Sequence, residues 1–282
     1  MNYYPAVRFW GSANSYGSYL SNASTDIMPW AKPGDGNHTA YFLVNNDFST
    51  NSWIYLLTFG STTTGLIPRP GYGVEKLTSG VNNGNITGRF RTSGDETSAS
   101  LNLFSPGSTS ILGYNTNTYN SGTNNNVNFR FNGKDDNSST SSTSGDRAFN
   151  WNYLSFENPS MLGPGWSYNR TMQGVMSEVI LYDRSLDGED RRKLESYLAF
   201  KYGVTLTPTN TSTNRFNYTF SDGTIAWEGD IASGIFADFY NNISAVIRDD
   251  AARLDNRHSH STNVGSLLHL GVAGKREPTL VE

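Results

Sequence analysis

The stretch that decides the fold is 174–206, GVMSEVILYDRSLDGEDRRKLESYLAFKYGVTL. Its first nine residues alternate and are rich in β-branched and aromatic side chains, which predicts a strand. DRSLDG then interrupts the alternation. Asp187, with Asp190 three residues later, is typical of a capped helix start. The sequence therefore predicts a strand that passes through a capped turn directly into a helix.

The helix predicted over 189–202 is the strongest helical signal in the chain. Lys201 falls in its last turn, where a cation suits the helix dipole. Gly203 follows as the expected left-handed residue just beyond the helix. Apolar residues recur at helical spacing and predict the buried face of an amphipathic helix. These residues are Leu194, Tyr197, Leu198 and Tyr202.

The composition is that of an all-β protein with long polar loops. Of the 282 residues only 16% are charged, whereas 13% are aromatic, and Gly, Asn, Ser and Thr are abundant. Such usage favours a β-sandwich over a helical enzyme. The net charge of −4 gives no basic footprint for nucleic acid. The chain contains no cysteine, so its stability cannot come from disulfides. No apolar run is long enough to insert in a membrane.

Several short segments resemble one known family. EVILYDRSL and YLAFKYG resemble the closing "EV-x-x-Y-x-R-x-L … YLA-x-KYG" signature of laminin-G-like, concanavalin A-like lectin domains. VRFWGSANSYGSYL resembles the opening strand and turn of those domains, and SDGTIAWEG resembles the segment that follows their helix. The domains recur in very large surface adhesins of Bacteroidetes-type bacteria. The resemblance implies an extracellular or cell-surface protein, with partners that are glycans or surface proteins.

The resemblance implies a concanavalin A-like antiparallel β-sandwich, or jelly roll, over 1–206, with the helix docked on it. Residues 207–282 are predicted to form a smaller β unit, with the start of an incomplete domain as the alternative. Between 105 and 147, where Ser, Thr, Asn and Gly dominate, only 127–132 is predicted to be a strand. The N-terminus lacks a signal-peptide core, so we expect a piece of a larger polypeptide. Other strands are predicted at 6–10, 41–44, 53–59, 85–92, 99–104, 149–156, 216–220, 224–228, 243–247 and 267–272.

Loop aromatics are the candidate ligand-binding residues. Trp10 ends the first predicted strand, Tyr16 and Tyr19 follow that strand, and Trp166 and Tyr168 precede the strand at 174–182. Aromatic faces suit the stacking of sugar rings, and binding loops cluster at the ends of β-sandwiches. The alternative is that these side chains pack in the core, at its rim or over the helix.

Oxygen ligands gather in one later loop. Asp249, Asp250, Asp255 and Asn256 form a candidate Ca²⁺ site, because Ca²⁺ prefers several hard oxygen ligands. Turn chemistry, with pairing to Arg248, is the alternative.

Histidines suggest a second candidate metal site. His258 and His260 are two residues apart and would face the same way on a strand, as ligands of a transition metal would. They lack a third ligand of clear spacing.

The sequence favours a non-catalytic protein. Retaining glycosidases of this fold need two carboxylates close together on one strand face. The same-face neighbours of Glu178 are Ile180 and Tyr182, so this strand offers no such pair. A G-x-S-x-G nucleophile elbow is absent. We therefore expect an adhesion module that binds glycan or protein. The alternatives are a structural spacer or assembly subunit of a surface fibre, secretion-linked complex or virion, and a polysaccharide hydrolase or lyase.

Overall fold

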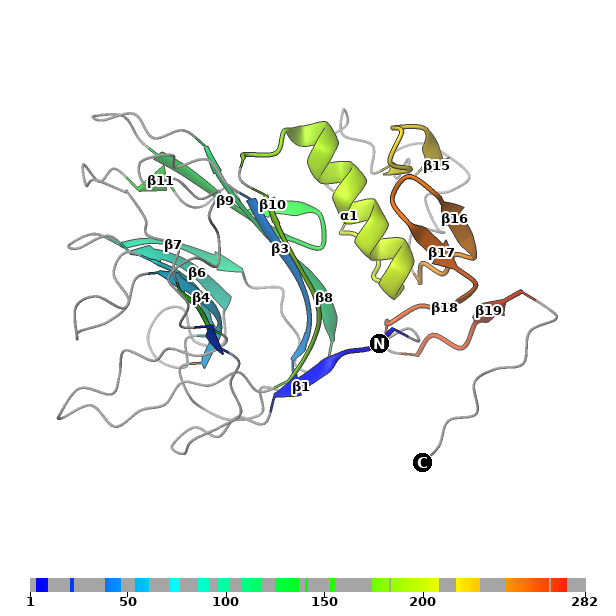
Figure 1. Ribbon diagram of the computed structural model, residues 1–282, viewed down its shortest axis with the longest axis horizontal. Coiled ribbons are helices and arrows are strands. Elements are labelled where there is room, and N and C mark those ends of the chain that lie inside the picture. Colours follow the sequence, from blue (N-terminus) through cyan, green and yellow to red (C-terminus); the bar gives the residue numbers. More distant parts are fainter. Residues whose placement is uncertain are drawn as a thin grey trace. The chain divides into compact units, whose positions relative to one another are not determined.

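The computed structural model describes residues 4–9, 21–22, 39–46, 54–60, 71–76, 86–91, 96–101, 108–117, 125–136, 140–141, 153–155, 174–182, 184–207, 217–228, 242–263 and 265–272. These residues form antiparallel strands and one helix, so the all-β prediction is confirmed (Figure 1). Contacts divide the chain into two compact units. One unit is Ala6–Asp187, and the other combines Gly188–Glu282 with Met1–Pro5.

The unit Ala6–Asp187 contains two antiparallel sheets. The first sheet has the order β1-β13-β3-β8-β9-β10, with β11 also paired to β9. Its strands are β1 (Val7–Phe9), β3 (Thr39–Asn46), β8 (Thr109–Asn117), β9 (Asn125–Phe131), β10 (Lys134–Asp136), β11 (Thr140–Ser141) and β13 (Gly174–Tyr182). The stretch 174–206 thus supplies a strand, β13, next to the centre of this sheet.

The second sheet has the order β2-β12-β4-β5-β6-β7. Its last strand contacts β9, β10 and β11 of the first sheet, and Figure 1 shows the two sheets as separate layers. Its strands are β2 (Ser21–Asn22), β4 (Ile54–Gly60), β5 (Gly71–Lys76), β6 (Ile86–Arg91), β7 (Glu96–Leu101) and β12 (Tyr153–Ser155).

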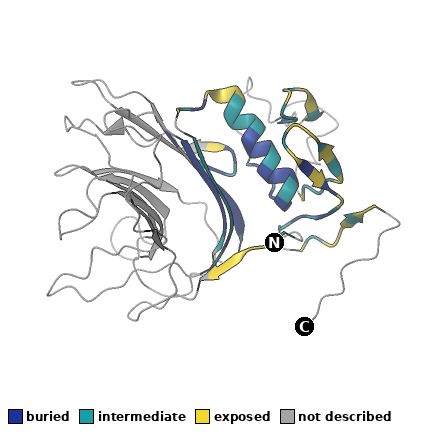
Figure 2. Cartoon of the chain, viewed as in Figure 1, coloured by how far each residue is buried: buried dark blue, intermediate teal, exposed yellow. Residues whose placement is uncertain are grey.

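The core of the first sheet lies along β3 and β8 (Figure 2). Tyr41 and Leu43 are fully buried on β3, and Ile111 is buried on β8. Tyr41 pairs in register with Gly113, where an added Cβ would lie 2.5 Å from Cε1 of the tyrosine ring. The glycine therefore makes room for a large aromatic core residue.

Strand β8 falls in the polar segment where only 127–132 is predicted to be a strand, and that prediction is wrong for 109–117. Its Thr and Asn residues occupy a central strand because β3 and β9 pair with both of its edges. Ser110, for example, is fully buried. Long-range pairing thus overrides a local composition that is typical of loops.

Strand β10 replaces part of a predicted polar loop. Asn132 and Gly133 join β9 to β10 with positive φ angles of 46° and 82°. Two such residues form the tight turn that suits the twist of a hairpin. The backbone N–H and side-chain Oδ1 of Asn132 both bond to the backbone of Ile111, at 2.8 Å each. The Asn-Gly pair is the local signal that could have predicted this hairpin.

The second unit contains the helix α1 (Gly188–Tyr202) and three two-stranded sheets. The helix contacts β14, β17 and β18 of its own unit. No helix among the described residues is long and apolar enough to span a membrane. The strands of this unit are β14 (Tyr218–Thr219), β15 (Ile225–Trp227), β16 (Ile247–Asp249), β17 (Leu254–Asn256), β18 (His258–His260) and β19 (His269–Gly271).

The predicted burial of the helix is confirmed for Leu194, Leu198 and Tyr202, whereas Tyr197 is half-buried. The middle of the helix also buries two polar residues, since Glu195 and Ser196 are both fully buried. The Ser196 hydroxyl accepts a hydrogen bond of 3.0 Å from the backbone N–H of Thr219. This bond ties the helix to the first hairpin that follows it.

The helix ends as predicted at Gly203, whose φ is +67°. The N–H of Val204 donates to the carbonyl of Ala199 at 3.2 Å, which is the six-residue bond of a Schellman cap. An added Cβ at Gly203 would overlap the backbone carbonyl oxygen of His260. The N–H of Thr262 also donates to the Gly203 carbonyl at 2.9 Å.

The division of the chain differs from the predicted boundary between 206 and 207. Contacts separate the units between Asp187 and Gly188, so the helix is grouped with the C-terminal residues. The physical reason is the set of contacts from α1 to β14, β17 and β18, which the sequence stretch alone could not reveal.

Candidate functional site

The register of the first sheet brings two predicted binding loops to a common edge. Phe9, the last residue of β1, pairs with Gly174, the first residue of β13. Asn46, the last residue of β3, pairs with Gly174 from the other side. Strand β1 therefore ends beside the point where β13 begins.

The second sheet repeats this arrangement. Ser21, the first residue of β2, pairs with Ser155, the last residue of β12. The described residues that flank the segments 10–20 and 156–173 are thus paired at both ends. We call this set of strand ends, marked by Phe9, Gly174, Ser21 and Ser155, the loop end of the sandwich.

The residues predicted to bind ligand belong to these two segments. Trp10, Tyr16 and Tyr19 stand between β1 and β2, whereas Trp166 and Tyr168 stand between β12 and β13. All five lie outside the described residues. The described strands nevertheless pair the residues that flank the two segments. This pairing cannot be predicted from the sequence of either segment.

The opposite end of the first sheet holds a buried polar cluster, which we call the exit latch (Thr39, Asn115, Ser185 and Leu186). Thr39 and Asn115 pair in register across β3 and β8, and both are almost fully buried. The Asn115 amide donates to the carbonyl of Leu186 and accepts from its N–H, at 3.2 Å each. The side chain therefore pairs with the backbone of Leu186 as a neighbouring strand would.

Two hydroxyl groups complete the exit latch. Thr39 Oγ1 accepts from the Leu186 N–H at 3.0 Å and lies 2.6 Å from Asn115 Oδ1. Ser185 Oγ donates to the same amide oxygen at 3.0 Å. Buried polar groups that are fully paired fix a backbone in one place. The chain thus leaves the sheet toward the helix at the end opposite to the loop end.

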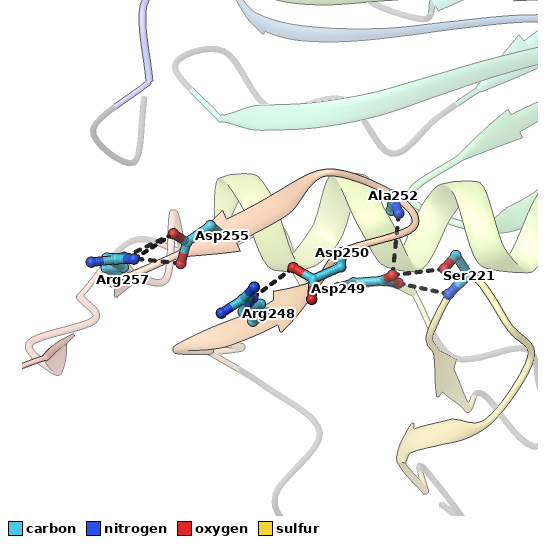
Figure 3. A network of polar contacts seen from close by, with 7 residues as sticks. All are labelled: Ser221, Arg248, Asp249, Asp250, Ala252, Asp255 and Arg257. Atoms are coloured by element: carbon cyan, nitrogen blue, oxygen red, sulfur yellow. Dashed lines mark hydrogen bonds and ion pairs between the residues drawn. The ribbon is translucent and has the colours of Figure 1, made fainter.

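The predicted calcium ligands lie on and around the hairpin of β16 and β17 (Figure 3). Asp249 accepts hydrogen bonds from the N–H and hydroxyl of Ser221, at 2.8 and 2.7 Å. It also accepts from the N–H of Ala252 at 3.2 Å. Burial opposes ionisation of Asp249, but these hydrogen bonds outweigh it and lower the pKa of the carboxyl. Asp249 therefore connects the turn at Ser221 with the turn at Ala252 through hydrogen bonds.

The other predicted ligands point to different partners. Asp250 forms an ion pair with Arg248 at 2.6 Å, and Asp255 forms one with Arg257 at 2.8 Å, as Figure 3 shows. Asn256 is buried, and its amide donates to the carbonyls of Phe200 and Ala245 at 2.9 and 2.8 Å. The structure thus gives each of the four residues a partner within the protein.

Within the described part of the chain, no three His, Asp or Glu side chains stand close enough to share a metal ion. The pairing of Asp250 with Arg248 matches the alternative that the sequence left open. Asn256 has a role that its position in a polar loop does not reveal. It satisfies a carbonyl in the last turn of α1, where the helix itself supplies no partner.

A second cluster surrounds Lys201 in the last turn of the helix. Its Nζ donates to Tyr197 Oη at 2.6 Å and lies 5.0 to 5.5 Å from the ring centroids of Tyr4, Tyr197 and Tyr202. Such distances are those of cation–π contacts. The contact with Tyr4 explains why Met1–Pro5 belong to the same unit as the helix.

The comparisons with known proteins divide the chain at a similar place. A family model described as "Domain of unknown function (DUF8202)" matches residues 190–279, about a third of the chain. The match begins inside α1 and includes all of β14 to β19. No curated protein matches the sequence.

Solved structures resemble the chain only distantly. A heptameric SAP-like pentraxin from Limulus polyphemus is 10% identical, with a TM-score of 0.47 over 67% of this chain and 81% of that one. The CBM40 module of a Ruminococcus gnavus sialidase, bound to α2,3 sialyllactose, is 12% identical, with a TM-score of 0.43 over 65% and 92%. The tailspike protein 2 of bacteriophage CBA120 is 12% identical, with a TM-score of 0.41 over 66% and 26%.

Proposed function

We propose that this protein is a non-catalytic binding module that recognises a glycan through the loop end of its sandwich. The observation that carries the proposal is the pairing of strand ends, Phe9 with Gly174 and Ser21 with Ser155. These pairs bring together the described residues that flank two segments containing the candidate aromatic residues. Aromatic residues from both segments could then act on one ligand.

The chemistry of the two segments suits a sugar. A tryptophan or tyrosine ring presents a flat apolar face, while its polar atom remains able to hydrogen-bond. Binding loops carried by a rigid sheet are the usual arrangement in β-sandwich proteins. The resemblance of 178–186 and 197–203 to laminin-G-like domains supports the same class of function. It also supports a place in a larger protein at the cell surface.

The proposal is tested by a glycan array probed with the labelled protein. We expect binding to a defined group of glycans, and loss of that binding in the variants Trp166→Ala and Trp10→Ala. Removing one anchoring aromatic should weaken the dissociation constant about tenfold or more, which is roughly 1.4 kcal/mol.

Trp30→Ala is the matched control. Trp30 belongs to the segment 23–38, which is followed by Thr39, at the end of β3 opposite to Asn46. Binding should survive in this variant. A protein that binds no glycan, or one whose binding is equally lost in all three variants, would contradict the proposal.

A second candidate function is contact with another protein in a surface assembly. The observation that favours it is a set of exposed apolar side chains near β19, with Leu267 90% exposed, Leu268 59% and Val272 51%. Exposed apolar groups that lie close together mark protein contacts. Analytical ultracentrifugation tests it: self-association that Leu267→Ser abolishes would support an assembly role, and a monomer at all concentrations would oppose self-assembly.

A further inference from the structure

The hairpin of β18 and β19 brings a third histidine to the two that the sequence singles out. His260 pairs in register with His269, and His258 pairs with Gly271. Side chains of directly paired residues, and of residues two apart on a strand, share one face of a hairpin. His258, His260 and His269 therefore lie on the same face.

That face is turned away from the interior of the unit. Ser259, on the opposite face, is fully buried, and its hydroxyl accepts from the N–H of Ala245 at 3.0 Å. By contrast, His258 and His260 are half-buried and His269 is exposed. The His269 imidazole is therefore open to solvent, and the His258 and His260 rings are partly open to it.

Two of the three rings already lie close to each other. The centroids of His260 and His269 are 5.0 Å apart and the rings stack with an interplanar angle of 24°. The ring of His258 lies over Gly271, where an added Cβ would be 2.9 Å from its Nδ1. A glycine opposite His258 thus leaves the space that this ring occupies.

We propose that His258, His260 and His269 form a surface site for a transition-metal ion such as Zn²⁺ or Ni²⁺. Neutral imidazoles are the preferred nitrogen ligands of these metals, and three histidines suffice for a zinc site whose remaining position is taken by water. Directly opposed side chains have Cβ atoms roughly 5 Å apart and diagonal neighbours roughly 7 Å apart, a triangle that one ion can span.

Ion binding requires the rings to rotate. Stacked rings direct their nitrogen lone pairs alongside each other, and in this arrangement the described part of the chain holds no three ligands at metal distance. Rotation about the side-chain torsions of His269, which is exposed, would turn its nitrogen toward His260.

Calorimetric titration of the protein without an affinity tag, with ZnCl₂ and separately with NiCl₂, tests the proposal. We expect one ion per chain. Binding should be lost in His260→Gln and His269→Gln and weakened in His258→Gln. The fourth histidine of the chain supplies the control, because His38→Gln should bind like the wild type.

A thermal unfolding experiment gives a second readout. An ion that binds the folded state raises the melting temperature, and this rise should be absent in His269→Gln. His269 is exposed, so this variant should fold even if His260→Gln does not. Absence of binding by the wild type, equal binding by His269→Gln, or unchanged affinity in His258→Gln would overturn the three-histidine site.

Discussion

Gly203 shows how one residue holds together two parts of the C-terminal unit. Its positive φ ends the helix, and its missing side chain admits the carbonyl of His260. Its own carbonyl accepts hydrogen bonds from the N–H of Thr262 at 2.9 Å and from the hydroxyl at 3.2 Å. The helix end and the strand β18 are therefore fixed by the same backbone position.

Comparison of Gly203→Ala with Gly265→Ala separates the effect of the positive φ from the effect of the nearby His260 carbonyl. Both glycines have a positive φ, but an added Cβ at Gly265 meets nothing within 4 Å. We expect Gly265→Ala to cost about 1 kcal/mol of unfolding free energy through backbone strain alone. Gly203→Ala should cost about 1–3 kcal/mol more, because the neighbouring strand must also move. Urea denaturation measures both, and equal costs would contradict the close approach.

Asp249 predicts an acid-sensitive hairpin. Its folded pKa is below the ordinary value of 3.8, so the charged form stabilises the folded state. That stabilisation is fully present above pH 3.8 and is lost as the pH falls through the lowered folded pKa. We expect the amides of 247–256 to lose protection from hydrogen exchange in this acid range. In Asp249→Asn, the protection of these amides should already be lower at pH 7 and should change less as the pH falls. A protection that depends on pH as in the wild type would refute the role of Asp249.

At the scale of elements, the exit latch is the counterpart of a helix cap. It satisfies the backbone of Leu186, between the end of β13 and the start of α1, with side chains from β3 and β8. The groups involved are almost fully buried, so losing a partner leaves a polar group without water. The path from strand to helix thus depends on residues more than seventy positions earlier.

Asn115→Ala should lower the free energy of unfolding by about 1–3 kcal/mol for each polar group that it leaves buried without a partner. The matched control is Asn45→Ala on β3. Asn45 is half-buried and donates to the Thr109 hydroxyl at 3.0 Å, so its loss should cost about 0.5–1.5 kcal/mol. Urea denaturation compares the two variants, and hydrogen exchange at the Leu186 amide localises the effect. An Asn115 variant as stable as the Asn45 variant would show that the latch adds nothing.

Patterns within a short stretch of sequence predict those elements that short-range interactions determine. The strand and helix of 174–203 are predictable because alternation, a capping residue, helical spacing and Gly203 agree along one stretch. Strand β8 is not predictable, because its Ser, Thr and Asn residues are ordinary loop formers until β3 and β9 pair with them. The loop end is hidden for the same reason, since the pairs Phe9–Gly174 and Ser21–Ser155 join distant positions.

At the scale of the molecule, the chain consists of two units that share the stretch 174–206. Its strand belongs to the sandwich, and its helix organises the C-terminal unit. The family match over 190–279 covers most of that unit. The stretch 174–206, which is continuous in sequence, therefore contributes to both units.

Leu198→Asp tests this division. Leu198 is fully buried in the helix, so a charge there should cost about 4 kcal/mol or more. We expect hydrogen exchange measured by mass spectrometry to show lost protection in 188–207, 217–228 and 242–272, with β3 and β8 still protected. Leu267→Asp, at a position 90% exposed, should leave both units protected. Protection lost across β3 and β8 as well would mean that the chain unfolds as a single body.

The central claim is that the two aromatic segments at the loop end serve one ligand. A double-mutant cycle tests it most directly, using Trp10→Ala, Trp166→Ala and the double variant, with affinity measured for a glycan that the wild type binds. Two residues that touch one ligand should be coupled by about 0.5–3 kcal/mol. The account predicts such a coupling. Losses that add to within about 0.5 kcal/mol, or a wild type that binds no glycan, would contradict it.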